Sequence, residues 1–166
     1  LQTASLQYRE AAQAWRALRQ PAMLADALDG LGVVYLAMGD AARARSQHEE
    51  SLPLWTSQKN ALGQSQALNN LGMAAHRERR FSEARQHFDR ALRLSPDDAR
   101  TQAYVLHNLG HLEADLGRHR EAVATLARSL EKSTAIGDQF SAARSLYRMG
   151  VSQQRLGLAD ARPNLE

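Results

Sequence analysis

A leucine–glycine or methionine–glycine pair recurs at nearly constant spacing along the chain. The four glycines are Gly32, Gly72, Gly110 and Gly150, so the successive intervals are 40, 38 and 40 residues. Self-similarity with a period of about 20–50 residues is typical of a solenoid, in which each repeated unit buries its apolar face against its neighbours. The spacing therefore predicts a stack of one repeated unit rather than a closed globule.

Each pair belongs to a longer helical pattern. A further leucine lies three residues before the pair in every copy: Leu28, Leu68, Leu106 and Leu146. Apolar residues at i, i+3, i+7 and i+10 in the first copy occupy one face of an α-helix. A glycine beside that face costs about 1 kcal/mol relative to alanine, a cost tolerated where a second helix approaches closely. We expect small residues twelve positions later to meet the glycines: Ala44, Ala84 and Ala122.

The repeat resembles the tetratricopeptide repeat. The likeness is carried by Leu28-x-x-Leu31-Gly32-x-x-Tyr35 and by Ala84-x-x-x-Phe88 followed by Pro96, with leucine where the family usually has tryptophan. Units near 40 residues resemble the variety found in kinesin light chains and in many bacterial regulators. The resemblance covers about residues 4–157 and implies an all-α fold, an α-α superhelix of antiparallel helix pairs.

The register divides a single predicted domain, residues 1–166, into repeats. Residues 4–20 match the second helix of a unit, because Trp15 and Trp55 are also 40 residues apart. Complete repeats are expected at 22–57, 61–94 and 98–135, followed by a partial repeat and tail at 138–166. After Gly157 the pattern fails, so the tail is interpreted as a severed second helix.

Local signals set the expected helix boundaries. Pro21 is expected to start a helix, where its missing N–H costs nothing. Turns are expected at Gly39 and Gly117, and Ser82 is a candidate N-cap. Pro53 falls inside a second helix and is expected to bend it or to loosen its last turn.

Composition excludes several classes of protein. The chain has no cysteine, so it can form neither disulfides nor a thiolate metal site. The absence of cysteine is compatible with the predicted cytoplasmic location, and abundant alanine and arginine favour a bacterial origin. The longest apolar stretch, around residues 31–38, is too short to cross a bilayer, so no membrane partner is expected. A net charge of +3 is too mild to require a polyanionic partner.

No catalytic motif is present. The chain lacks the nucleophile elbow, the phosphate loop and the His-Glu-x-x-His zinc motif, so we predict neither enzyme activity nor a cofactor. His107 and His111 share a helical face at i, i+4, a spacing that suits zinc, and His76 holds a related position one repeat earlier. No carboxylate completes the set, so we predict no metal site.

A peptide-binding groove is predicted on the first helix of each pair, which lines the inner surface of such superhelices. The residues expected there lie off the buried stripe: Asn69, Asn70, Met73, His76, Arg77, Tyr104, His107, Asn108, His111, Arg144, Tyr147, Arg148 and Arg155. Asp26 and Asp29 are expected at the other end of the same surface.

Two features of this groove suggest what it holds. Asn70 and Asn108 share one position in the repeat, and an amide both donates and accepts, which suits a peptide backbone. The resemblance to kinesin light chain repeats implies this role for both residues; the alternative is that they bond to adjacent helices. The four arginines of the set favour carboxylates and phosphates, which predicts an acidic peptide, unless they are simply solvated.

These observations favour a protein–protein interaction scaffold that grips a segment of a partner. One alternative is a peptide-sensing regulatory domain of a larger bacterial transcriptional or signalling protein. Nucleic-acid binding is a second alternative, disfavoured because only Tyr104 and Tyr147 offer stacking and because acids interrupt the basic charge. Cut faces at both ends of the stack also predict self-association.

Overall fold

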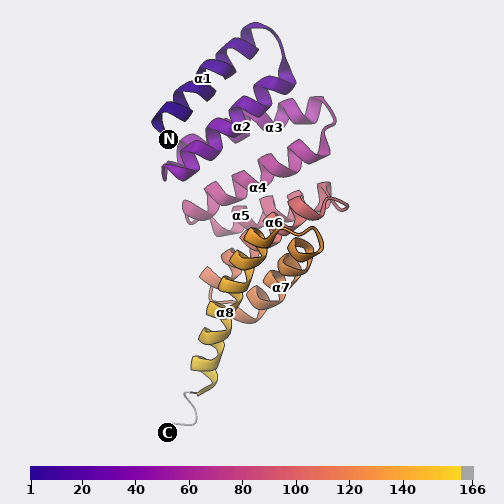
Figure 1. Cartoon of the computed structure of the whole chain (residues 1–166). Helices are drawn as coiled ribbons and strands as arrows, with labels where there is room; N and C mark the ends of the chain where they lie inside the picture. Colours follow the sequence, from indigo (N-terminus) through magenta and orange to yellow (C-terminus); the bar gives the residue numbers. More distant parts are fainter. Residues whose placement is uncertain (162–166) are drawn as a thin grey trace. The chain divides into compact units, whose positions relative to one another are not determined.

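The computed structural model describes residues 1–161, and over this range every regular element is an α-helix (Figure 1). In chain order the helices are α1 (Gln2–Ala17), α2 (Pro21–Ala37), α3 (Ala41–Ser57), α4 (Ala61–Arg77), α5 (Phe81–Leu94), α6 (Ala99–Asp115), α7 (His119–Ala135) and α8 (Gln139–Ala161). The predicted all-α fold class is confirmed. The predicted tail beyond 161 lies outside the described residues.

The helices group into two compact units. The first unit, Leu1–Ser95, holds α1 to α5, and each of these helices packs against the next. The second unit begins at Pro96 and holds α6, α7 and α8, which all contact one another. The division falls within the one glycine interval that is 38 rather than 40 residues long.

The links between paired helices share one backbone geometry. Six of them are three residues long, and the middle residue of each has a positive φ: Arg19, Gly39, Lys59, Arg79, Gly117 and Gly137. The next residue donates its N–H to a carbonyl five positions back, as Asp40 does to Tyr35 at 2.9 Å. These bonds define the Schellman motif that ends a helix. The turns predicted at Gly39 and Gly117 are confirmed.

This turn also sets where the next helix begins, two residues after the left-handed residue. Pro21 starts α2 as predicted. The prediction of an N-cap at Ser82 was wrong, because the turn at Arg79 makes Phe81 the first residue of α5. At Pro53 the chain stays helical and α3 continues to Ser57.

A bulky side chain from the second helix covers the glycine of each complete pair. A Cβ atom added to Gly72 would lie 2.5 Å from the ring of Phe88, and one added to Gly32 would lie 2.4 Å from the ring of His48. At Gly110 the same role falls to Leu126, 2.6 Å away. Glycine is therefore required at these positions because no side chain fits under the covering residue.

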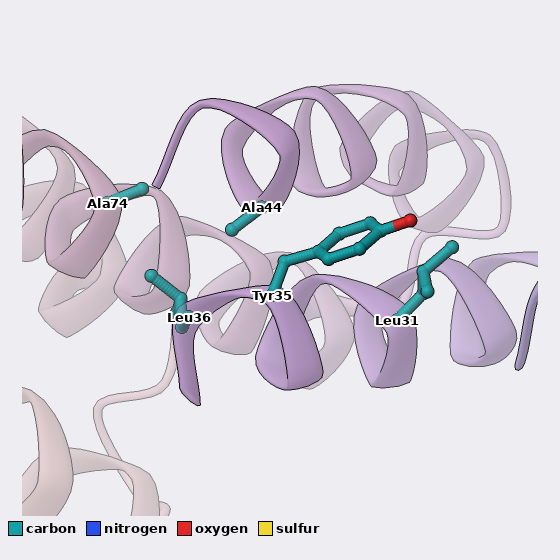
Figure 2. Packing of buried hydrophobic residues seen from close by; sticks show 5 residues of the cluster. All are labelled: Leu31, Tyr35, Leu36, Ala44 and Ala74. Atoms are coloured by element: carbon teal, nitrogen blue, oxygen red, sulfur yellow. The ribbon is translucent and has the colours of Figure 1, made fainter. Parts of the chain in front are cut away.

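Two of the three alanines expected to meet these glycines are not among the atoms nearest to them. Ala44 is fully buried, but it packs with Leu31, Tyr35 and Leu36 of α2 and with Ala74 of α4 (Figure 2). The nearest atoms to Gly32 and Gly72 belong to the covering rings instead. The prediction of a close approach was correct. The predicted alanine partner is found at Gly110, where the backbone oxygen of Ala122 lies 3.4 Å from the Cβ position, whereas at Gly32 and Gly72 the residue one helical turn later fills the space.

Buried serines join paired helices at a second point. Ser65 of α4 donates its hydroxyl to the carbonyl of Ala91 in α5 at 2.8 Å. In the second unit Ser129 of α7 donates to the carbonyl of Ala103 in α6 at 2.7 Å. Ser65 and Ala91 occupy the same repeat positions as Ala103 and Ser129, so the serine lies on the first helix of one pair and on the second helix of the other. The small residues at these positions let the two helices cross closely, and the serine hydroxyl satisfies a buried carbonyl.

Substituting equivalent glycines is expected to have opposite effects on stability. Gly72→Ala forces a methyl group against Phe88 and is expected to lower the free energy of unfolding by about 1–2 kcal/mol. Nothing lies within 4 Å of a Cβ at Gly150. Gly150→Ala should therefore raise the free energy of unfolding by up to about 1 kcal/mol, because alanine has the higher helix propensity. Chemical denaturation followed by circular dichroism at low protein concentration measures both changes; equal effects at the two sites would contradict this packing.

Candidate functional site

The predicted groove residues divide between the two units, so each surface is described by itself. Those of the first unit lie on α4: Asn69, Asn70, Met73, His76 and Arg77. Those of the second unit lie on α6 and α8: Tyr104, His107, Asn108, His111, Arg144, Tyr147, Arg148 and Arg155. The expected stacking of Asn70 with Asn108 spans both units and stays a prediction.

On α4, the two neighbouring asparagines interact with each other. The Oδ1 atom of Asn70 accepts a hydrogen bond from Nδ2 of Asn69 at 3.3 Å, and that same amide approaches the sulfur of Met73. Both asparagines are half-buried. Among the described residues no acceptor takes up the amide N–H groups of Asn70, so Asn70 retains donors for a ligand.

The other two polar residues of the α4 surface also make structural contacts. Arg77 donates to the carbonyl of Leu36 near the end of α2, where a cation complements the helix dipole. His76 lies edge-on to Phe81, with the ring centroids 5.9 Å apart. Arg77 nevertheless remains exposed at the end of α4.

The carboxylate of Asp29 is directed into a helix–helix contact rather than toward the expected groove. Its oxygens accept from Ser51 Oγ at 2.5 Å and from Trp55 Nε1 at 2.7 Å, and His48 Nδ1 lies 2.7 Å away. All three partners belong to α3 and are buried. The expectation that Asp29 lies on the binding surface is thus corrected: its charge is used to join α2 to α3. Asp26 stays exposed.

In the second unit, His107 is part of a buried polar chain. Its side chain is only 4% exposed, and Nδ1 lies 3.1 Å from the hydroxyl of Ser145 in α8. Ser145 in turn lies 3.0 Å from Ser129 of α7, so the chain connects all three helices of the unit. A ligand cannot reach His107 in this conformation, and we leave it out of the proposed site.

Burial also sets the charge state of His107. It lowers the pKa of the imidazole to about 4, and the positive charges of Arg144, His111 and Arg148 act in the same direction. The neutral ring is thus the form that fits here. His111 is partly exposed and its Nε2 lies 3.5 Å from Asp115. No group of three metal-ligating side chains occurs anywhere in residues 1–161.

The exposed face of α8 combines arginines with aromatic rings. Tyr147 and Phe140 are each 71% exposed, and the guanidinium of Arg144 lies 5.9 Å from the centre of the Phe140 ring. Within the described part of the chain, Arg144 and Arg148 have no carboxylate partner. The two arginines are four residues apart in α8 and so lie on the same face of the helix. This surface can attract anions.

Two further residues complete this surface. Tyr104 of α6 donates its hydroxyl to Oδ2 of Asp138 at 3.4 Å, next to the start of α8. Hydrogen bonds from the backbone and side chain of Ser141 lower the pKa of that carboxyl group. Phe140 was not among the predicted groove residues, although it lies one helical turn before Arg144 on the same face of α8; that spacing was the signal that could have found it.

Comparisons with known proteins agree with this fold. Two models of the tetratricopeptide repeat match the sequence, one over residues 23–97 and one over residues 103–131, together more than half of the chain. The chain belongs to the tetratricopeptide repeat family. Repeats of this family are generally modules for protein–protein interaction and are typically non-enzymatic scaffolds. No curated protein sequence matches the chain.

Solved structures share the arrangement of helices. BtubC (BKLC) from P. vanneervenii has a TM-score of 0.77 at 22% identity, covering 94% of this chain and 66% of that chain. TPR-like repeats of a kinesin light chain from Podosopora anserina have a TM-score of 0.56 at 13% identity, covering 96% of this chain and 92% of that one. At these identities the likeness shows the fold alone.

None of the helices within the described residues is both long enough and apolar enough to cross a membrane.

Two aspartates one helical turn apart are expected to differ sharply in their contribution to stability. Asp29→Ala leaves the buried donors of α3 without their acceptor, which should lower the free energy of unfolding by about 2–4 kcal/mol. Asp26→Ala, its matched control, changes an exposed side chain and should have an effect below about 0.5 kcal/mol. Denaturant titrations of both variants measure the difference; a neutral Asp29→Ala would refute the structural role of this carboxylate.

The buried imidazole of His107 should make folding sensitive to mild acid. The ordinary pKa of histidine is near 6.5, so between pH 6.5 and 4 the unfolded state binds a proton that the folded state excludes. The free energy of unfolding should therefore fall by on the order of 2 kcal/mol between pH 6.5 and pH 4.5, and it should be fully regained above pH 6.5. His107→Gln should flatten that slope in unfolding measurements across this range; an unchanged slope would contradict the assignment.

Proposed function

We propose that this chain is a protein-interaction scaffold that binds an extended segment of a partner protein along the first helices of its repeats. The observation that carries the proposal is the exposed face of α8, where Arg144 and Arg148, which have no carboxylate partner among the described residues, lie beside exposed aromatic rings. In the first unit, the free amide donors of Asn70 support the same function, because they can bind a peptide carbonyl.

The chemistry of α8 favours an acidic segment. A guanidinium group binds a carboxylate through two parallel hydrogen bonds, and Arg144 and Arg148 are not engaged in such pairs with described residues. The neighbouring Tyr147 and Phe140 offer apolar surface against which a bound chain can pack. A peptide that carries carboxylates beside apolar groups therefore matches both the charge and the exposed aromatic area of this surface.

The partner segment can also be a signalling peptide, in which case the chain is a sensing domain of a larger bacterial regulator. The scaffold and the sensing domain would use the same surface, and for both we propose a cytoplasmic location. Nucleic acid remains the competing ligand, because arginines interleaved with exposed aromatic rings also suit single strands. The binding experiment must therefore compare these ligands directly.

Charge reversal on α8 is expected to abolish binding of an acidic peptide. The probe is a fluorescein-labelled twelve-residue peptide of alternating aspartate and serine, followed by fluorescence anisotropy. Arg144→Glu combined with Arg148→Glu should weaken its affinity at least tenfold, because each substitution replaces a guanidinium with a repelling carboxylate. The matched control, Arg118→Glu with Arg128→Glu, makes the same change in net charge on exposed residues at the start of α7 and within it, and should weaken binding far less.

Three outcomes would overturn the proposal. A peptide in which lysine replaces aspartate should bind at least tenfold more weakly, and equal binding would remove the acidic preference. Equal losses in both double variants would indicate general charge attraction rather than a site. Tighter binding of a labelled oligouridine, lost in the α8 variant alone, would replace the peptide with single-stranded nucleic acid.

A further inference from the structure

A tyrosine hydroxyl lies between two arginines where the first three helices meet. The ring of Tyr35 in α2 is only 5% exposed and packs in the core with Leu31 and Ala44 (Figure 2). Its hydroxyl oxygen accepts a hydrogen bond from Nη2 of Arg9 in α1 at 3.3 Å. The guanidinium of Arg43 in α3 lies over the same ring, 4.5 Å from the ring centre. Cations from two different helices therefore converge on one phenol group, and these three residues form the tyrosine cluster.

The positive charge of the tyrosine cluster is only partly balanced. Asp40 accepts a hydrogen bond from Nε of Arg43 at 2.5 Å. This bond raises the pKa of Arg43, and the Tyr35 hydroxyl adds to the effect. Arg9 has no carboxylate partner among the described residues. Two guanidinium groups thus share one carboxylate, which leaves one positive charge uncompensated.

The next contact between α1 and α3 shows the balanced arrangement. Arg16 lies seven residues after Arg9, and Glu50 lies seven residues after Arg43. Arg16 and Glu50 form an ion pair that joins the two helices. Two helical turns earlier an arginine takes the place of the glutamate. Like charges so placed repel each other unless an anion lies between them.

The tyrosine cluster is not a general property of the repeat. Forty residues later the same three positions hold Glu49, Ala75 and Glu83. There Arg80 pairs with Glu83, so an arginine of the chain itself meets the charge, and no side-chain hydroxyl is present. The cluster is also complete in itself, because α2 packs against both α1 and α3 within the first unit.

We infer that Arg9, Tyr35 and Arg43 bind a phosphate group. Each guanidinium has N–H groups left to donate, and the Tyr35 hydroxyl accepts from Arg9 while keeping its own proton to donate. Donors that arrive from three helices suit the several oxygens of a tetrahedral anion, whereas a carboxylate offers two and Asp40 already supplies one. A phosphate monoester also carries close to two negative charges at neutral pH. A small phosphorylated molecule and a phosphorylated side chain of a partner present the same oxygens.

NMR titration of the ¹⁵N-labelled chain tests this site. The probes are inorganic phosphate and a capped glycine–phosphoserine–glycine peptide, each added at about pH 7.5, where the dianion predominates. The Nε–Hε resonances of Arg9 and Arg43 should shift along saturable curves. Arg9→Gln should weaken binding about tenfold, because a charged hydrogen-bond donor is lost. Tyr35→Phe keeps the buried ring, removes only the hydroxyl and should weaken binding severalfold.

A matched variant separates the site from general attraction by the positive chain. Arg16→Gln removes the same charge from α1, but from an arginine paired with Glu50, and should change the dissociation constant less than about twofold. Circular dichroism confirms that each variant is folded. Saturable binding of either probe supports the site: tighter binding of the peptide assigns the phosphate to a partner protein, and binding of inorganic phosphate alone assigns it to a small molecule.

Three results would overturn the inference. The first is a set of arginine shifts that stay linear with either probe up to about 50 mM, which would show the absence of a site. The second is equal weakening by Arg9→Gln and Arg16→Gln. The third is acetate that binds as tightly as phosphate. The acidic peptide proposed as the ligand of α8 carries no phosphate, and Arg144→Glu with Arg148→Glu leaves the tyrosine cluster unchanged, so the two sites are tested separately.

Discussion

The packing of one bulky side chain over one glycine determines how each helix pair is assembled. Phe88 over Gly72 and Leu126 over Gly110 use different side chains to fill the same space, so the geometry depends on the missing Cβ rather than on the covering residue. His48 serves at Gly32 and adds a polar link, because its other ring nitrogen lies against Asp29. A repeat can thus vary its covering residue while its helices keep the same close approach.

The turn between helices imposes a second constraint, which acts through the backbone. The left-handed residue ends one helix and fixes the start of the next, whether that residue is Gly39 or Lys59. A non-glycine residue in this conformation costs about 1 kcal/mol or more, which the packing of the flanking helices offsets.

The fold could be predicted from sequence because both constraints leave a periodic signal. The Leu-Gly pairs and the register of Trp15 with Trp55 were sufficient for the helix pairs. The site was less predictable, since a helical position does not reveal which neighbour a polar side chain meets. Asp29 and His107 occupy equivalent positions in the repeat, and both side chains turn toward another helix, where their partners lie 19 to 38 residues away in the sequence.

Proton NMR of the glycine α-protons tests the central packing claim most directly. If Phe88 lies on Gly72, the α-protons of that glycine should be shifted upfield by the ring current and show nuclear Overhauser effects to the ring. Gly110 lies under an aliphatic side chain and Gly150 under none of the described residues, so neither should show a ring-current shift. A Gly72 resonance at the position of an ordinary helical glycine, without contacts to Phe88, would contradict this account.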